Sequence, residues 1–161
     1  MVKFLFNIFE WSLAMSSSQK IVWDRRYNLG MAMVDKQHKK IFELVNKIYE
    51  IDDSDNVKED IKKLLYEFKD YMQVHFEDEE KYMESIAYPN LQKHRELHEK
   101  IIQNVMQVIQ KPVNISILKS KIKIIIKRSF IEHILQEDIK IKIFTDQNNI
   151  ADEEIFEITN N

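Results

Sequence analysis

Two pairs of possible metal ligands lie close together in the middle of the sequence. His75 is followed four residues later by Glu79, and His94 is followed four residues later by His98. On an α-helix this step advances a side chain by about 6 Å and keeps it within about 40° of the same face. Imidazole binds iron, zinc or copper, and a carboxylate can bridge two ions. The spacing therefore predicts a metal site on two consecutive helices, separated by a break at residues 88–90.

The remaining histidines extend this pattern toward both ends of the chain. His38 precedes the two pairs, and His133 follows them with Asp138 five residues further on. A five-residue step turns a regular α-helix by about 140° from the starting face, so Asp138 cannot lie directly above His133. We expect either that the Asp138 side chain reaches sideways or that the helix is locally distorted.

The hydrophobic residues recur with helical spacing through most of the chain. We predict an all-α fold, an antiparallel up-down-up-down four-helix bundle with an N-terminal arm at residues 21–34. Asp35 and Asn114 are candidate N-caps, and Asn56 with Glu59 resembles a capping box. The four expected helices span residues 36–51, 57–85, 91–110 and 115–144.

Composition supports this fold and excludes several classes of function. With 161 residues and 44% hydrophobic side chains the chain can form one domain with a core, and one glycine with two prolines favours long helices. The absence of cysteine excludes disulfides, thiolate ligands, iron–sulfur clusters and a cysteine nucleophile. It is compatible with the cytoplasmic location that we expect. The net charge of −3 gives no sign of a nucleic-acid-binding surface.

The two ends of the chain differ from the middle. In residues 1–20 hydrophobic side chains recur with helical spacing, but polar residues interrupt the run, which is also too short to span a bilayer. We therefore expect an amphipathic extension that packs on the domain or on a protein partner, and no integral membrane segment. The expected division is this extension at 1–20, the helical bundle at 21–146 and a polar tail at 147–161.

The helical phase places all five histidines on the inward faces of the expected helices. Each could alternatively be a hydrogen-bonded core residue, but five of them on four helices favour metal ligation. An unpaired ionised carboxylate in a core is strongly unfavourable, and coordination to a cation offsets that cost. The candidate ligands are His38, His75, Glu79, His94, His98, His133 and Asp138.

The order of these motifs resembles the bacterial hemerythrin-like family. The chain carries a lone His, then His-x3-Glu, His-x3-His and His-x4-Asp, and this set includes all seven ligand positions of that family. Residues typical of the family flank them, among them the run from Asp35 to His38 and the Tyr88-Pro89 pair. The resemblance covers about residues 23–144.

The resemblance implies two non-haem iron ions with an oxo or hydroxo bridge. One iron would be held by His94, His98 and His133, and the other by His38 and His75. Glu79 and Asp138 would bridge the two ions. The second iron would keep a free coordination position, where dioxygen would bind.

We therefore expect reversible dioxygen binding, for storage, delivery or sensing, in a protein that is not an enzyme. Five neutral imidazoles and two carboxylates give the site less negative charge than the roughly four carboxylates of oxygen-activating di-iron bundles. The alternatives are a di-iron enzyme acting on peroxide or nitric oxide, and a metal-buffering protein. Ser129 stands where family members often carry Trp, which favours a wider pocket unless Phe130 compensates.

Overall fold

The computed structural model describes residues 21–51, 58–111 and 114–150. Long helices make up most of this part of the chain, which contains no strand. A short 3-10 helix in the arm precedes them, and two π-helical segments interrupt the last one. The elements are η1 (Arg25–Tyr27), α2 (Ala32–Glu50), α3 (Lys58–Ser85), α4 (Leu91–Gln110), α5 (Ile115–Ile125), η3 (Ile126–Ile131), η4 (Ile134–Asp138) and α6 (Ile139–Gln147).

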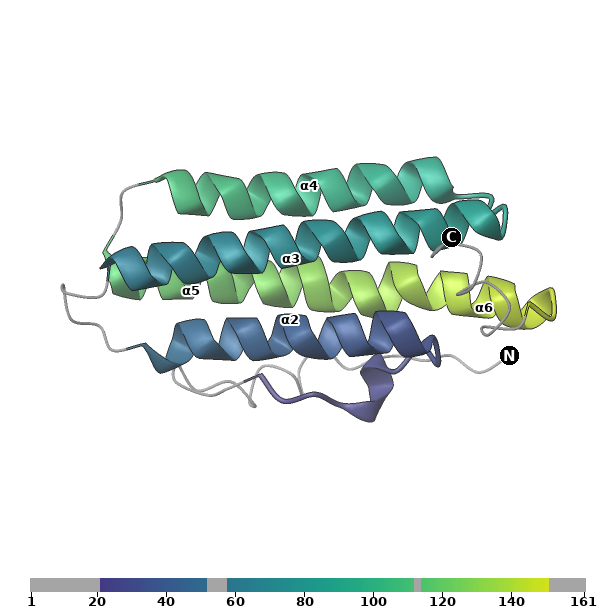
Figure 1. Ribbon diagram of the computed structural model, residues 1–161, viewed down its shortest axis with the longest axis horizontal. Helices are drawn as coiled ribbons and strands as arrows, with labels where there is room; N and C mark the ends of the chain where they lie inside the picture. Colours follow the sequence, from purple (N-terminus) through teal and green to yellow (C-terminus); the bar gives the residue numbers. More distant parts are fainter. Residues whose placement is uncertain (1–20, 52–57, 112–113, 151–161) are drawn as a thin grey trace.

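These elements form an antiparallel bundle of four rods. Figure 1 shows α2, α3 and α4 running in alternating directions, with α5 to α6 as one continuous fourth rod. Each rod turns its hydrophobic stripe inward, and the core contains large side chains with almost no exposed surface, such as Phe68, Met72 and Phe130. The predicted all-α bundle is confirmed.

Most of the predicted helix ends are close to the observed ones. The third helix spans residues 91–110 as expected, and the Asn114 side chain caps α5 by accepting a hydrogen bond from the Ile117 N–H at 2.9 Å. Asn56 of the expected capping box, residues 1–20 and residues 151–161 lie outside the described residues. The predicted N-terminal extension, and the tail beyond residue 150, therefore stay predictions.

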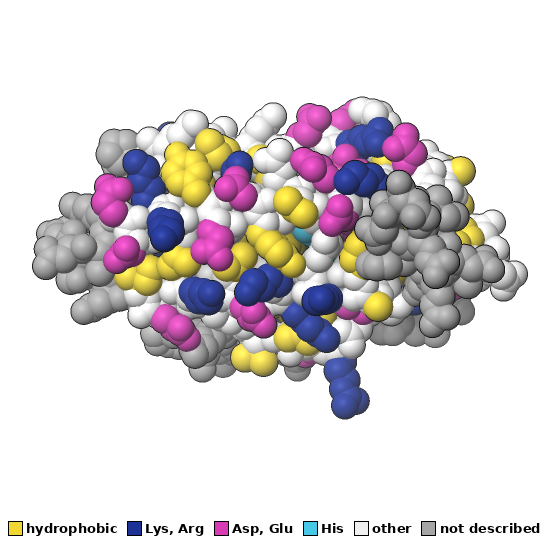
Figure 2. All heavy atoms as spheres, viewed as in Figure 1, with side chains coloured by type: hydrophobic (Ala, Val, Ile, Leu, Met, Phe, Trp, Pro, Cys, Tyr) yellow, Lys and Arg dark blue, Asp and Glu magenta, His cyan; other side chains and the backbone are white. Residues whose placement is uncertain are grey.

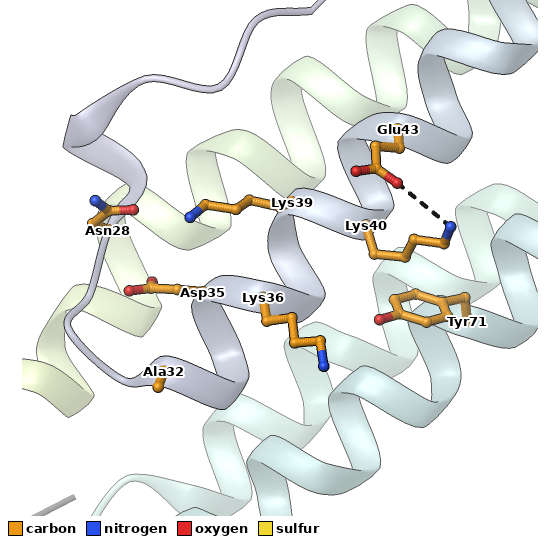
Figure 3. Close-up of a pocket in the computed structure, with 8 residues that line it drawn as sticks. All are labelled: Asn28, Ala32, Asp35, Lys36, Lys39, Lys40, Glu43 and Tyr71. Carbon is orange, nitrogen blue, oxygen red and sulfur yellow. Dashed lines mark hydrogen bonds and ion pairs between the residues drawn. The ribbon is translucent and has the colours of Figure 1, made fainter.

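The predicted N-cap at Asp35 is wrong, because α2 begins four residues earlier with Met31 at the cap position. The Asp35 carboxylate instead accepts hydrogen bonds from the N–H groups of Leu29 and Gly30, at 2.7 and 3.1 Å. Figure 3 shows Asp35 pointing from α2 toward the arm, beside a surface groove that Tyr71 of α3 borders on the other side. The acidic side chain therefore holds the arm to the first turn of the helix.

The arm is fixed to the bundle at several points. The Ile21 backbone exchanges two hydrogen bonds with the Asn46 side chain of α2, at 2.8 and 2.9 Å. The arm also buries Tyr27 and Leu29. Gly30 adopts φ +79°, which favours glycine because a side chain there would be strained. The expected ordered arm is therefore present.

The fourth rod is not a regular α-helix. Two π-helical segments, η3 and η4, lie in its middle, and η4 runs from Ile134 to Asp138. A π-helix forms hydrogen bonds between residues five apart and is found frequently at functional sites. Of the two alternatives expected for Asp138, the structure shows the local distortion of the helix.

None of the helices in the described part of the chain is both long and apolar enough to cross a membrane.

Replacing Asp35 by alanine should lower the free energy of unfolding by roughly 1.5–3 kcal/mol, the range for hydrogen bonds to a charged group. The cause would be the loss of the acceptor for the Leu29 and Gly30 N–H groups. Urea unfolding would measure it, with the exposed neighbour Lys36→Ala as the control, expected within about 0.5 kcal/mol of the native protein. Equal stability of the two variants would contradict this role for Asp35.

Candidate metal centre

The structure brings all seven predicted site residues together in the middle of the bundle. Their side chains come from all four rods, and none of the seven residues is more than 6% exposed. Only a small spot of histidine surface is visible on the face drawn in Figure 2. Two overlapping groups have potential ligand atoms within 4.8 Å of one another: Glu79, His94, His98, His133 and Asp138, and His38, His75 and Glu79.

The histidine nitrogens converge in two sets. His98 Nε2 and His94 Nε2 lie 3.0 and 3.1 Å from His133 Nε2. In the other set, His38 Nε2 lies 3.1 Å from His75 Nε2. Such a concentration of imidazole nitrogens around shared points fits a metal centre better than separate hydrogen-bonded core histidines.

The two carboxylates lie between these sets. Asp138 Oδ1 is 2.9 Å from His133 Nε2, and Asp138 Oδ2 is 3.5 Å from His38 Nε2, so one carboxylate faces both sets. Glu79 Oε2 is 3.2 and 3.4 Å from the Nε2 atoms of His98 and His94. Glu79 also belongs to the group with His38 and His75. Both carboxylates therefore have the position required of a bridge between two ions.

The hydrogen bonding of these carboxylates supports a cation site. All four oxygens of Glu79 and Asp138 are buried, and none accepts a hydrogen bond despite the nearby histidine nitrogens. A buried ionised carboxylate without hydrogen-bond donors is very costly unless a charge compensates it. The donor set, five imidazoles and two carboxylates, suits iron and also zinc or copper. The residues present thus fit the two-metal centre that their pattern suggests.

The π-helical turn explains how His133 and Asp138 reach the same point. On a regular α-helix the two side chains would diverge by about 140°. Segment η4 follows directly after His133 and ends at Asp138. Residues five apart lie close to one face in this geometry, which accounts for the 2.9 Å distance between His133 Nε2 and Asp138 Oδ1.

Two further side chains orient the histidines from outside. His75 Nδ1 lies 3.0 Å from Gln37 Oε1, and His98 Nδ1 lies 2.8 Å from Glu80 Oε1. Because both oxygens are acceptors, each Nδ1 carries the proton and each Nε2 turns its lone pair inward. The sequence places Gln37 in the family-like run from Asp35 to His38 but gives it no role of its own. Its position directly before His38 is the signal that could have indicated one.

Aromatic rings close the site on several sides. Phe130 is fully buried, and its ring lies edge-on to His38 and His75 with centroids 5.6 and 6.3 Å away. Phe76 stacks on His98 at a centroid distance of 3.9 Å. Ser129, at the position where family members often carry Trp, is half-buried. The neighbouring Phe130 supplies an aromatic wall of the site.

Burial lowers the pKa of one histidine of the cluster, and neighbouring carboxylates raise the pKa of another. Burial, followed by the charge of His38, lowers the pKa of His75 to about 3. Burial would also lower the pKa of His94, but Asp138 and Glu79 beside it outweigh this effect and raise it to about 9. Burial would raise the pKa of Asp138, yet neighbouring His133 holds it well below its ordinary range. The carboxylates therefore stay ionised and ready to bind a cation.

Comparison with known proteins agrees with this geometry. The family described as "Hemerythrin HHE cation binding domain" matches residues 29–142. The chain is similar to a bacteriohemerythrin of Clostridium acetobutylicum, 34% identical over 87 residues, which covers 52% of this chain and 67% of the relative. It is also similar to a bacteriohemerythrin of Campylobacter jejuni, 27% identical over 128 residues, or 79% and 92% of the two chains. No solved structure matches the chain significantly.

The metal-free protein should be most stable near pH 6.5. Below that pH, stability should rise as the pH rises. The reason is that His75 binds a proton in the unfolded chain but not in the folded protein, where its pKa is about 3. Between about 6.5 and 9 stability should fall, because folded His94, with its pKa of about 9, holds a proton that the unfolded chain loses. Ferrous iron would displace that proton, so the fall should be smaller in the loaded protein.

Urea unfolding between about pH 5 and 9, under argon and with or without ferrous iron, would measure this profile. The variant His94→Gln is the control, and its metal-free stability should fall less between pH 6.5 and 9 than that of the native protein. A smaller fall should remain, because Glu79 and Glu80 also raise the pKa of His98 against the effect of its burial. A native metal-free protein with no fall in that range would contradict the assigned protonation of His94.

Proposed function

Because the chain belongs to the hemerythrin family, we propose that it binds dioxygen reversibly at a non-haem di-iron centre. The role in the cell would be storage, delivery or sensing of oxygen. The observation that carries the proposal is the pair of fully buried carboxylates, whose four oxygens accept no hydrogen bond of good geometry and are surrounded by five converging imidazoles. Such a set needs cations, and it offers enough ligands for two of them.

The two sets of histidines divide the ligands between the ions. His94, His98 and His133 would hold one iron, and Glu79 and Asp138 would bridge it to the other. The second iron would receive only His38 and His75 besides the bridges. Bound in this way, the two ferrous ions would supply the electrons that dioxygen takes up on binding and returns on release.

The chain's own residues favour binding over catalysis. Of the described residues, only two carboxylates enter the cluster. Oxygen-activating di-iron bundles use about four, so highly oxidised iron would be less stabilised here. Burial of all seven side chains and the rings of Phe130 and Phe76 exclude water from the cluster. Exclusion of water and of proton donors slows the irreversible oxidation that would end reversible binding.

Iron analysis and visible spectroscopy would test the proposal. The reduced protein should contain two irons per chain, develop a charge-transfer band on exposure to air and lose that band when oxygen is removed. Rapid turnover of peroxide or nitric oxide would instead identify an enzyme. One zinc per chain, or a band that fades irreversibly in air, would contradict oxygen binding.

His38→Ala should impair oxygen binding most directly. The variant removes one of the two imidazoles assigned to the second iron, so its iron content should fall from two toward one per chain. The affinity for oxygen should fall more than about tenfold, the usual scale for disturbing a metal site. Iron analysis would measure the loss of iron, and oxygen titration of the visible band would measure the loss of affinity.

The control for this variant is Lys40→Ala, which removes a side chain paired with Glu43 on the outer side of α2. It should leave iron content and oxygen binding unchanged. Oxygen binding that is unaltered in His38→Ala would refute the assignment of His38 and His75 to the ion that meets oxygen.

A further inference from the structure

The two sets of histidines have different hydrogen-bond partners behind them. His75 Nδ1 lies against the neutral amide of Gln37, at 3.0 Å from Oε1. His98 Nδ1 lies against the carboxylate of Glu80, at 2.8 Å from Oε1. The Nδ1 atom of His38 is buried with no hydrogen-bond partner. Within the described part of the chain, no carboxylate is therefore hydrogen-bonded to the Nδ1 atom of His38 or of His75.

The orientation of the Gln37 amide follows from its second contact. Gln37 Nε2 donates to Asp78 Oδ2 at 2.8 Å, so its oxygen must be the atom that faces His75. Asp78 lies on α3, one turn beyond His75 on the same helix. Gln37 thus connects α2 to α3 and fixes the ring of His75 with its Nε2 lone pair toward the cluster. Gln37 and Asp78 are half-buried, which makes this link accessible to substitution.

The charge of the partner affects the strength of the ligand. An imidazole that donates to a carboxylate becomes a more basic metal ligand than one that donates to an amide. The carboxylate of Glu80 contacts His98 directly and is also paired with Arg95 at 3.3 Å. The carboxylate of Asp78 reaches His75 only through the amide of Gln37.

We infer that Gln37 is a positioning residue that orients His75 and, by its neutrality, keeps the His38–His75 half of the cluster the weaker metal-binding half. The inference rests on the proposed two-metal centre and deepens it. The half backed by Glu80 binds its ion more tightly, so the ion on the half assigned to oxygen is the one held less firmly. The half with three imidazoles is also expected to bind its ion more tightly than the half with two. The hydrogen-bond partners Gln37 and Glu80 increase this difference in affinity.

The variant Gln37→Glu with Asp78→Asn isolates the contribution of the partner. It moves one negative charge from position 78 to position 37, keeps the net charge, and lets the new amide at position 78 donate to the new carboxylate. We expect its weaker site to bind cobalt(II) about tenfold more tightly than in the native chain. A purely structural role for Gln37 predicts no gain. Asp78→Asn alone is the matched control: it lacks the new carboxylate at position 37 and should give no gain in affinity at the weaker site.

The reciprocal variant is Glu80→Gln, which replaces the carboxylate behind His98 by an amide. It should weaken the tighter site about tenfold and leave the weaker site unchanged. Calorimetric titration of each metal-free protein with cobalt(II) chloride would give both constants, and circular dichroism would check the fold. Because Glu80 is also half-buried, this variant tests the inference even if the double variant does not fold.

The outcomes separate the inference from the proposed function. Two cobalt ions per native chain, with a gain in the double variant and a loss in Glu80→Gln, would support it. Unchanged or lowered affinity of the weaker site in a folded double variant, or an unchanged tighter site in Glu80→Gln, would overturn it. Either of these results would leave reversible oxygen binding standing. A native chain that binds fewer than two cobalt ions would overturn the inference and the two-metal centre together.

Discussion

Two ionised carboxylates in the core are the constraint on which the rest of the structure depends. Glu79 and Asp138 have no exposed surface, and their four oxygens accept no hydrogen bond. In a core of this kind, uncompensated charges would cost several kcal/mol each. Every rod of the bundle contributes a histidine that faces them, and aromatic rings such as Phe130 exclude water around the cluster. Bound cations would offset the cost of burying these two charges.

The fourth rod shows how the backbone adapts to this constraint. A regular helix would bury either His133 or Asp138 at the cluster, but not both on one line. The π-helical turn from Ile134 to Asp138 changes the phase of the helix at that point. The arm contacts this segment from outside, and its buried Tyr27 and Leu29 tie it to the bundle. The irregular turn is therefore the feature that brings both side chains of the fourth rod to the cluster.

Sequence was sufficient for the features that follow from periodicity. The 3.6-residue repeat places His38, His75 and Glu79 inward, and the structure agrees. Features that depend on tertiary partners were beyond it. Asp35 had the sequence signal of an N-cap, but its carboxylate accepts hydrogen bonds from the backbone of the arm instead. Gln37 lies in the run that resembles the family, but its role could not be predicted, because its contact with Asp78 joins residues 41 positions apart.

The most direct test of this account is an anomalous difference map from crystals of the protein loaded with iron. The account predicts two peaks in the core, about 3.5–4 Å apart as in other two-metal sites. One should lie next to the Nε2 atoms of His94, His98 and His133, the other next to those of His38 and His75, with Glu79 and Asp138 between them. A single peak, or two peaks outside this cluster, would contradict it.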